Sequence, residues 1–166
     1  MLRKIYNFLD WLIKIGAYIA GIFILLMAFM TFYEVIARGF FNSPTSWALE
    51  LSIYSLIGSC FLGSAYGVRT YSHITVDLFV NTLSERGRII INYIVNVLGL
   101  LFSVIFTIYG FKQVLKTYEL GTTSTSLLRI PMYLPELMLP VGGILLMIAF
   151  ILQIVDGKAH PGGDQA

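Results

Sequence analysis

The stretch WALELSIYSLIGSCFLGSAYGVRTYSHITVD, residues 47–77, decides the fold because it joins an apolar segment to a short polar one. Residues 51–68 carry no charge between Glu50 and Arg69. As a helix they would be about 27 Å long at ~1.5 Å per residue, which nearly crosses a bilayer. The stretch therefore predicts a membrane-spanning helix.

Small residues recur at every fourth position of this helix. At such a spacing they let helix backbones approach closely in lipid, where van der Waals packing and hydroxyl hydrogen bonds replace the hydrophobic effect. We expect a tight helix contact at Ser55, Ser59, Gly63 and Gly67. The alternative is that serine and glycine are simply common in membrane helices.

The whole chain has the composition of a membrane protein. Of its 166 residues, 57% are hydrophobic and 12% are charged, whereas soluble domains carry about 25% charged residues. Uncharged runs of about 20 residues, the length that spans a bilayer, occur at 15–33, 51–68, 89–111 and 137–155.

These runs predict an all-α integral membrane protein with four transmembrane helices in one domain, residues 1–155, followed by a flexible tail at 156–166. The expected spans cover about 12–37, 47–68, 89–111 and 130–155. Pro131 suits the first turn of the last span, whereas Pro140 should kink it.

Three charged residues flank the first connection. Glu34 and Arg38 are spaced i, i+4, and Glu50 follows in the first turn of the second helix. Asn42-Ser43-Pro44 predicts a tight turn between them. Carboxylates near a membrane are candidates for function, but at this edge we favour a structural ion pair of Arg38 with Glu34 or Glu50.

The segment after the second span predicts a short in-plane helix. Its apolar residues follow the i, i+3, i+4, i+7 pattern of an amphipathic helix lying on the membrane, at Val76, Phe79, Val80 and Leu83. Before it lies a polar connection that contains Arg69, His73 and Asp77. His73 and Asp77 either contact a partner, or Asp77 favours the helix start while His73 is solvated.

The third span has one small and polar face. Asn92, Asn96, Gly99 and Ser103 lie on it, and Thr107 and Gly110 continue it. Lipid offers asparagine no hydrogen bonds. We therefore expect this face to meet the small residues of the second helix or a partner protein.

The positive-inside rule indicates the orientation. With four spans, one side carries seven lysines and arginines and the other carries four, namely Arg38, Lys112, Lys116 and Arg129. The bias places both termini in the cytoplasm.

No catalytic, cofactor-binding or metal-binding constellation is expected. The two histidines, His73 and His160, lie outside the spans, and Cys60 is the single cysteine. The net charge of +2 comes from scattered basic residues, which argues against a nucleic-acid partner. A self-contained four-helix exporter, working as a proton-coupled dimer, is the alternative function. It would need an ionisable residue deep in a span.

Several short motifs together resemble the small membrane subunit (DctQ-like small permease protein) of tripartite ATP-independent periplasmic (TRAP) transporters. They extend over most of residues 30–150: Arg38 with Phe40, Asn42-Ser43-Pro44, Trp47-Ala-Leu-Glu50-Leu, Gly63-Ser-Ala-Tyr-Gly-Val-Arg69, His73-Ile-Thr-Val-Asp77, Leu127-Leu-Arg-Ile-Pro131 and Leu139-Pro140-Val-Gly.

The resemblance implies a non-enzymatic subunit of a sodium-driven importer of organic acids, such as dicarboxylates or sialic acid, in the bacterial inner membrane. Its expected partners are a large membrane subunit, which it braces, a periplasmic substrate-binding protein and the lipid bilayer. Docking of the binding protein is expected at the outward connections, through Asn42, Ser43, Lys112 and Lys116.

Overall fold

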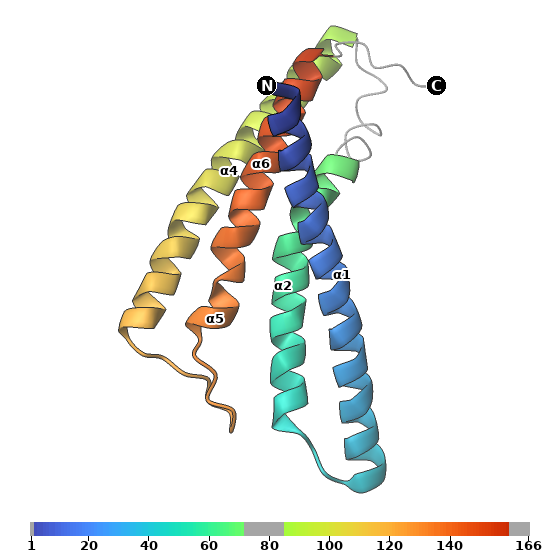
Figure 1. Cartoon of the computed structure of the whole chain (residues 1–166), viewed down its shortest axis with the longest axis vertical. Helices are drawn as coiled ribbons and strands as arrows, with labels where there is room; N and C mark the ends of the chain where they lie inside the picture. Colours follow the sequence, from blue (N-terminus) through green and yellow to red (C-terminus); the bar gives the residue numbers. More distant parts are fainter. Residues whose placement is uncertain (1, 72–84, 160–166) are drawn as a thin grey trace.

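The computed structural model describes residues 2–71 and 85–159, and this part of the chain forms two helical hairpins. The first pairs α1 (Leu2–Phe41) with α2 (Ser46–Tyr71). The second pairs α4 (Glu85–Glu119) with α5 (Tyr133–Glu136) and α6 (Met138–Ala159). Contacts between α2 and α6 hold the two hairpins together. The hairpins lie close to each other near the start of α1 and separate toward the opposite end (Figure 1).

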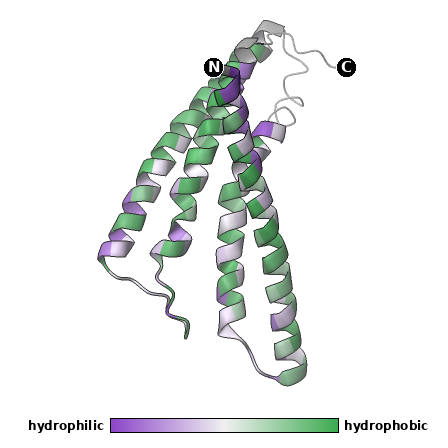
Figure 2. Ribbon diagram, viewed as in Figure 1, coloured by the Kyte–Doolittle hydropathy of each residue, from purple (hydrophilic) through white to green (hydrophobic). Residues whose placement is uncertain are grey.

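Four of these helices are long and apolar enough to cross a membrane, which confirms the predicted fold class. Hydrophobic residues dominate their middle parts, and hydrophilic ones gather toward the ends (Figure 2). The predicted in-plane helix at 76–83 lies outside the described residues.

The helices extend beyond the predicted spans. Helix α1 has 40 residues, about 60 Å of helix. It begins before the predicted span because the charged residues of its first turns can also be part of a helix. Helix α4 continues through Lys112 and Lys116, which were expected in a connection. It ends where Gly121 adopts a φ of 61° and the Thr122 N–H donates to the Thr117 carbonyl at 3.3 Å, a typical glycine-terminated helix end.

The last span starts later than predicted and is interrupted. Pro131 does not begin the helix, because it pairs with Thr123 in an isolated antiparallel bridge. The break falls at Leu137, between α5 and α6. Pro140 has no N–H for the Glu136 carbonyl, which explains a break one turn before the proline.

Small residues and a few larger apolar ones form the contacts between helices. A cluster of Ile13, Ala65, Ala149 and Leu152 is almost fully buried where α1, α2 and α6 meet. Many large apolar side chains point outward instead, such as Tyr18, which is 76% exposed. This inversion suits a chain whose surroundings are as apolar as its interior.

Gly142 tests the contact between α2 and α6. A Cβ at this position would lie 2.7 Å from the backbone oxygen of Phe61, which cannot move aside as a flexible side chain can. We expect Gly142→Ala to lower the free energy of unfolding in detergent by about 1–3 kcal/mol.

The matched control is Gly21→Ala, because nothing lies within 4 Å of a Cβ at Gly21. Alanine is the better helix former, so this variant should be unchanged or slightly more stable. Equal stability of the two variants would contradict the close contact.

Candidate functional site

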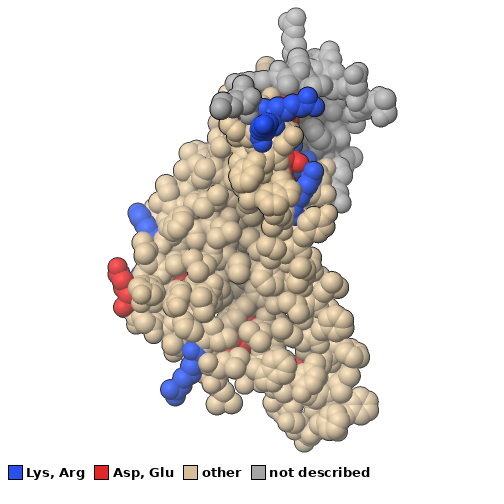
Figure 3. Space-filling view, in the orientation of Figure 1, with Lys and Arg blue, Asp and Glu red and all other residues tan. Residues whose placement is uncertain are grey.

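The charged residues lie at two levels along the helices. In α1, Lys14 and Glu34 are 20 residues apart, about 30 Å of helix, which matches the thickness of the bilayer hydrocarbon. In α2, Glu50 and Arg69 have nearly the same separation. On the face shown in Figure 3, lysine and arginine side chains gather near the start of α1, and the other charged side chains are scattered lower on the molecule. Lys14 and Arg69 mark the first level, and Glu34 and Glu50 mark the second. Each level is therefore a polar layer at one membrane surface.

At the first level, Arg69 of α2 holds three helices together. Its Nη1 lies 2.6 Å from Asp156 Oδ2 of α6, and its Nη2 lies 3.1 Å from Asp10 Oδ1 of α1. The same Nη2 donates to Tyr6 Oη at 2.6 Å, and the Tyr6 hydroxyl donates to Asp156 at 2.9 Å. We call these four residues the Arg69 cluster.

The Arg69 cluster is partly shielded from solvent, with Asp156 as its most exposed member, and balanced in charge. The Arg69 side chain is only 16% exposed, and Lys14 Nζ lies 3.0 Å from Asp10. Two cations thus face two carboxylates. Next to the cluster, Gln153 Nε2 donates to the Val68 carbonyl at 2.6 Å, a further link from α6 to α2.

The sequence prediction placed Arg69 in a connection, and this was wrong, because α2 continues to Tyr71. His73 and Asp77 lie outside the described residues. The partners Tyr6, Asp10 and Asp156 were not identified from the sequence. The order of the spans could have predicted them. With four antiparallel spans, charged residues just before the first span and just after the last span lie at the level of Arg69.

At the second level, Glu34 connects the first hairpin to its own turn. It accepts from Arg38 Nη2 at 3.1 Å, from the Thr45 N–H at 2.9 Å and from the Thr45 hydroxyl. Arg38 therefore pairs with Glu34, one of the two partners considered. The turn includes Asn42 with a φ of 49° and a hydrogen bond from Ser43 N to Ala37 O at 3.1 Å.

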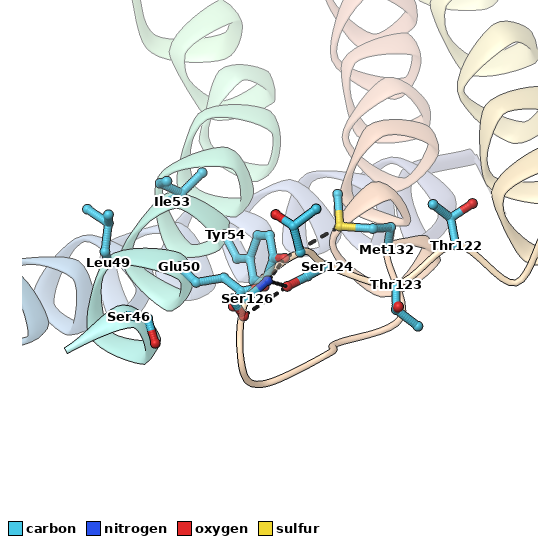
Figure 4. Close-up of a pocket in the computed structure, with 11 residues that line it drawn as sticks. Ser46, Leu49, Glu50, Ile53, Tyr54, Thr122, Thr123, Ser124, Ser126 and Met132 are labelled. Atoms are coloured by element: carbon cyan, nitrogen blue, oxygen red, sulfur yellow. Dashed lines mark hydrogen bonds between the residues drawn. The ribbon is translucent and has the colours of Figure 1, made fainter.

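Glu50 makes a different contact, which joins the two hairpins. It accepts from the Tyr54 hydroxyl at 2.5 Å and from the Ser126 hydroxyl in the loop before α5. The Tyr54 hydroxyl also lies 3.5 Å from the Met132 sulfur. Ser124 supports Ser126 with a hydroxyl contact at 2.9 Å (Figure 4).

A cavity of about 520 Å³ lies between α2 and this loop. Its walls combine apolar side chains, hydroxyl groups and one carboxylate (Figure 4). They are formed by Ser46, Leu49, Glu50, Ile53, Tyr54, Thr122, Thr123, Ser124, Thr125, Ser126 and Met132. We call this space the Glu50 cavity.

The predicted small residues of α2 lie in different surroundings. Ser55 and Ser59 are buried, and a Cβ at Gly63 would lie 3.3 Å from the Cβ of Ala20 in α1. Nothing lies within 4 Å of a Cβ at Gly67.

The polar face of α4 meets α6, which was not among its expected partners. A Cβ at Gly99 would lie 2.3 Å from the ring of Phe150, and Ser103 is fully buried. Asn92 and Asn96 are half-buried.

The lysines expected to dock the binding protein, Lys112 and Lys116, are exposed on the last turns of α4. Lys112 Nζ lies 5.3 Å from the centre of the Tyr109 ring. Asn42 and Ser43 are also exposed at the same end of the molecule.

Comparison with known proteins identifies the family. Residues 27–159 match the model of the family described as "Tripartite ATP-independent periplasmic transporters, DctQ component". The C4-dicarboxylate TRAP transporter small permease protein DctQ of Rhodobacter capsulatus is 35% identical over 70% of this chain. The match covers 50% of that relative, so the chain spans about half of its length.

Two relatives from Vibrio cholerae match over greater lengths. Its C4-dicarboxylate TRAP transporter small permease protein DctQ is 26% identical over 90% of this chain and 78% of the relative. The sialic acid TRAP transporter small permease protein SiaQ of the same organism is 28% identical over 94% of this chain and 85% of the relative.

Replacement of Arg69 tests the cluster. Arg69→Gln would leave Asp156 without a cation and Asp10 with Lys14 alone, so we expect the free energy of unfolding in detergent to fall by about 1–3 kcal/mol, less than for a fully buried pair because Asp156 is partly exposed. The double variant Arg69→Gln/Asp156→Asn should lose less than the sum of its single changes, because the two residues share one interaction.

Lys14→Gln is the control, since Lys14 is 58% exposed and pairs only at the surface. Its effect on stability should be barely measurable. A similarly small effect of Arg69→Gln would refute the structural role of the cluster.

Proposed function

Because the chain belongs to the DctQ family of tripartite ATP-independent periplasmic transporter components, we propose that it is the small, non-catalytic membrane subunit of such a transporter. In this proposal it braces the large membrane subunit and helps to dock a substrate-binding protein. The complex imports an organic acid of the dicarboxylate or sialic acid type, driven by sodium. The observation that carries the proposal is the family match over residues 27–159.

The distribution of charge supports a subunit without a transport site of its own. The carboxylates Glu34, Glu50 and Glu136 all lie at one edge of the spans, and the middle of every span is uncharged. Glu34 and Glu50 are engaged in contacts that hold turns and loops. Glu136 accepts from Gln113 Nε2 at 3.3 Å. A carrier needs an ionisable group along its pathway.

The outward faces of α1 and α4 are the proposed bracing surfaces. Large apolar residues such as Phe29 and Phe102, 71% and 61% exposed, cover them. They suit either lipid or the apolar helices of a larger membrane subunit.

The docking surface is proposed at the level of Glu34 and Glu50. Its carboxylates Glu34 and Glu50 are turned toward the protein, whereas Lys112 and Lys116 are exposed and outnumber the exposed Glu119 on the same helix end. A basic surface accelerates association with an acidic partner.

The orientation is testable with reporter fusions. We propose that the protein lies in the bacterial inner membrane with both termini in the cytoplasm, because more basic residues lie on the side of the termini than on the other. A reporter active only in the periplasm should be inactive when fused at Ala166 and active when fused within residues 121–126. Periplasmic activity from the fusion at Ala166 would reverse the assignment.

Reconstitution distinguishes a subunit from the alternative, a small proton-coupled exporter. We expect no uptake of organic acid by the purified chain alone in liposomes under a sodium or proton gradient, because no charge lies in the middle of a span. Adding the large subunit and a loaded binding protein should produce uptake, and omitting this chain should abolish it. Gradient-driven transport by the chain alone would favour the exporter, with Glu34, Glu50 and Glu136 as the groups to test.

The same assay tests docking. Lys112→Glu/Lys116→Glu should weaken stimulation by the binding protein, most strongly at low salt, where screening is weakest. Lys4→Glu, an exposed lysine at the opposite end of the helices, is the matched control. Equal effects of the two changes would exclude a local docking role.

A further inference from the structure

The Glu50 cavity lies at the depth of lipid head groups. Glu50 is the last charged residue before the uncharged run of α2, at the edge of the hydrocarbon layer. The apolar side chains of Leu49 and Ile53 are 56% and 47% exposed, so they form an open apolar wall beside it. The loop residues 122–126 form the opposite, hydroxyl-rich wall (Figure 4). The cavity is therefore polar on one side and apolar on the other.

The cavity has the charge of a site for a cation. Glu50 is the one acidic group among the described residues that line it, and no lysine or arginine is among them. In the structure Glu50 accepts hydrogen bonds from the hydroxyls of Tyr54 and Ser126, and the Ser124 hydroxyl is also within reach of the carboxylate. A carboxylate can accept about four. Glu50 thus retains capacity for a further donor.

We propose that the Glu50 cavity binds a phospholipid whose head group carries a primary amine, as in phosphatidylethanolamine. The ammonium donates to the Glu50 carboxylate, the phosphate accepts from hydroxyls such as those of Thr123 and Thr125, and the acyl chains lie on Leu49 and Ile53. This inference does not depend on the proposed transport function.

Charge and donor chemistry favour this head group over others. An anionic head group such as phosphatidylglycerol would approach an unneutralised carboxylate, which costs energy at the low dielectric of the membrane edge. A choline group is cationic but has no N–H to donate, whereas a primary ammonium has three. The cavity volume of about 520 Å³ falls within the usual range for ligand sites.

Lipid retention by the full chain tests the proposal. The purified chain is incubated with equal amounts of phosphatidylethanolamine, phosphatidylcholine and phosphatidylglycerol in detergent, and bound lipid is counted by native mass spectrometry. We expect one phosphatidylethanolamine to be retained about tenfold more strongly than either competitor, the effect of one charge-assisted hydrogen bond. Equal retention of the three lipids, or retention of none, would overturn the proposal.

Two variants localise the lipid. Glu50→Gln should abolish the preference for the amine head group, and Ile53→Trp should displace the lipid by filling the cavity. If Glu50→Gln does not fold, Ile53→Trp still decides, because residue 53 is half exposed on the helix surface. Unchanged lipid binding by folded Ile53→Trp would place the lipid elsewhere and refute the site.

The matched controls change the same chemistry outside the cavity. Glu119→Gln removes an exposed carboxylate at the same end of the molecule, and Leu56→Trp adds the same bulk to a 51% exposed position of α2. Both should retain phosphatidylethanolamine as the unmodified chain does. Loss of the lipid in both controls would contradict a site at Glu50.

Discussion

The arrangement of the helices depends on one partly buried cation. The Arg69 guanidinium lies between Asp10 of α1 and Asp156 of α6, 3.1 Å and 2.6 Å away, and so fixes α2 against the first and last spans. In a low-dielectric setting, an unpaired guanidinium would cost several kcal/mol. Conformations that separate α1, α2 and α6 at this end are therefore strongly disfavoured. Further from this cluster the two hairpins diverge, and at the opposite end the Glu50 contacts tie the loop before α5 to α2.

Between the two polar layers, close packing rather than ion pairing holds the helices together. Lipid is as apolar as leucine, so burying leucine gains little, and helices must associate through close van der Waals contact and hydrogen bonds. This explains why alanine, glycine and serine fill the contacts, as Ala65, Ala149 and Ser103 do with no exposed surface. It also explains why the large apolar residues of α1 and α4 face outward.

The sequence predicted the four spans, because a charge-free run of about 20 residues has few other interpretations. It also indicated Glu34, spaced i, i+4 on the same helix, as one of two candidate partners of Arg38, and the structure pairs Arg38 with Glu34. It did not predict that Arg69 pairs with Asp10 and Asp156, because these contacts join residues 59 and 87 positions apart and depend on how the spans pack. The polar face of α4 was assigned to α2 or a partner for the same reason. Periodicity identifies a face, but not the helix that covers it.

The contacts of the carboxylates support the proposed role of a subunit without a transport site of its own. Glu34 holds a turn and Glu50 holds a loop, so these acidic groups are committed to structure. Moving Glu50 toward a passing ion or substrate would break its bonds to Tyr54 and Ser126 and release the loop from α2. A group that serves as a fixed anchor is poorly suited to cycle between two states during transport. A rigid brace has the opposite requirement, because its polar contacts must hold while a neighbouring subunit moves, and the fixed contacts of Glu34 and Glu50 suit the bracing role proposed above.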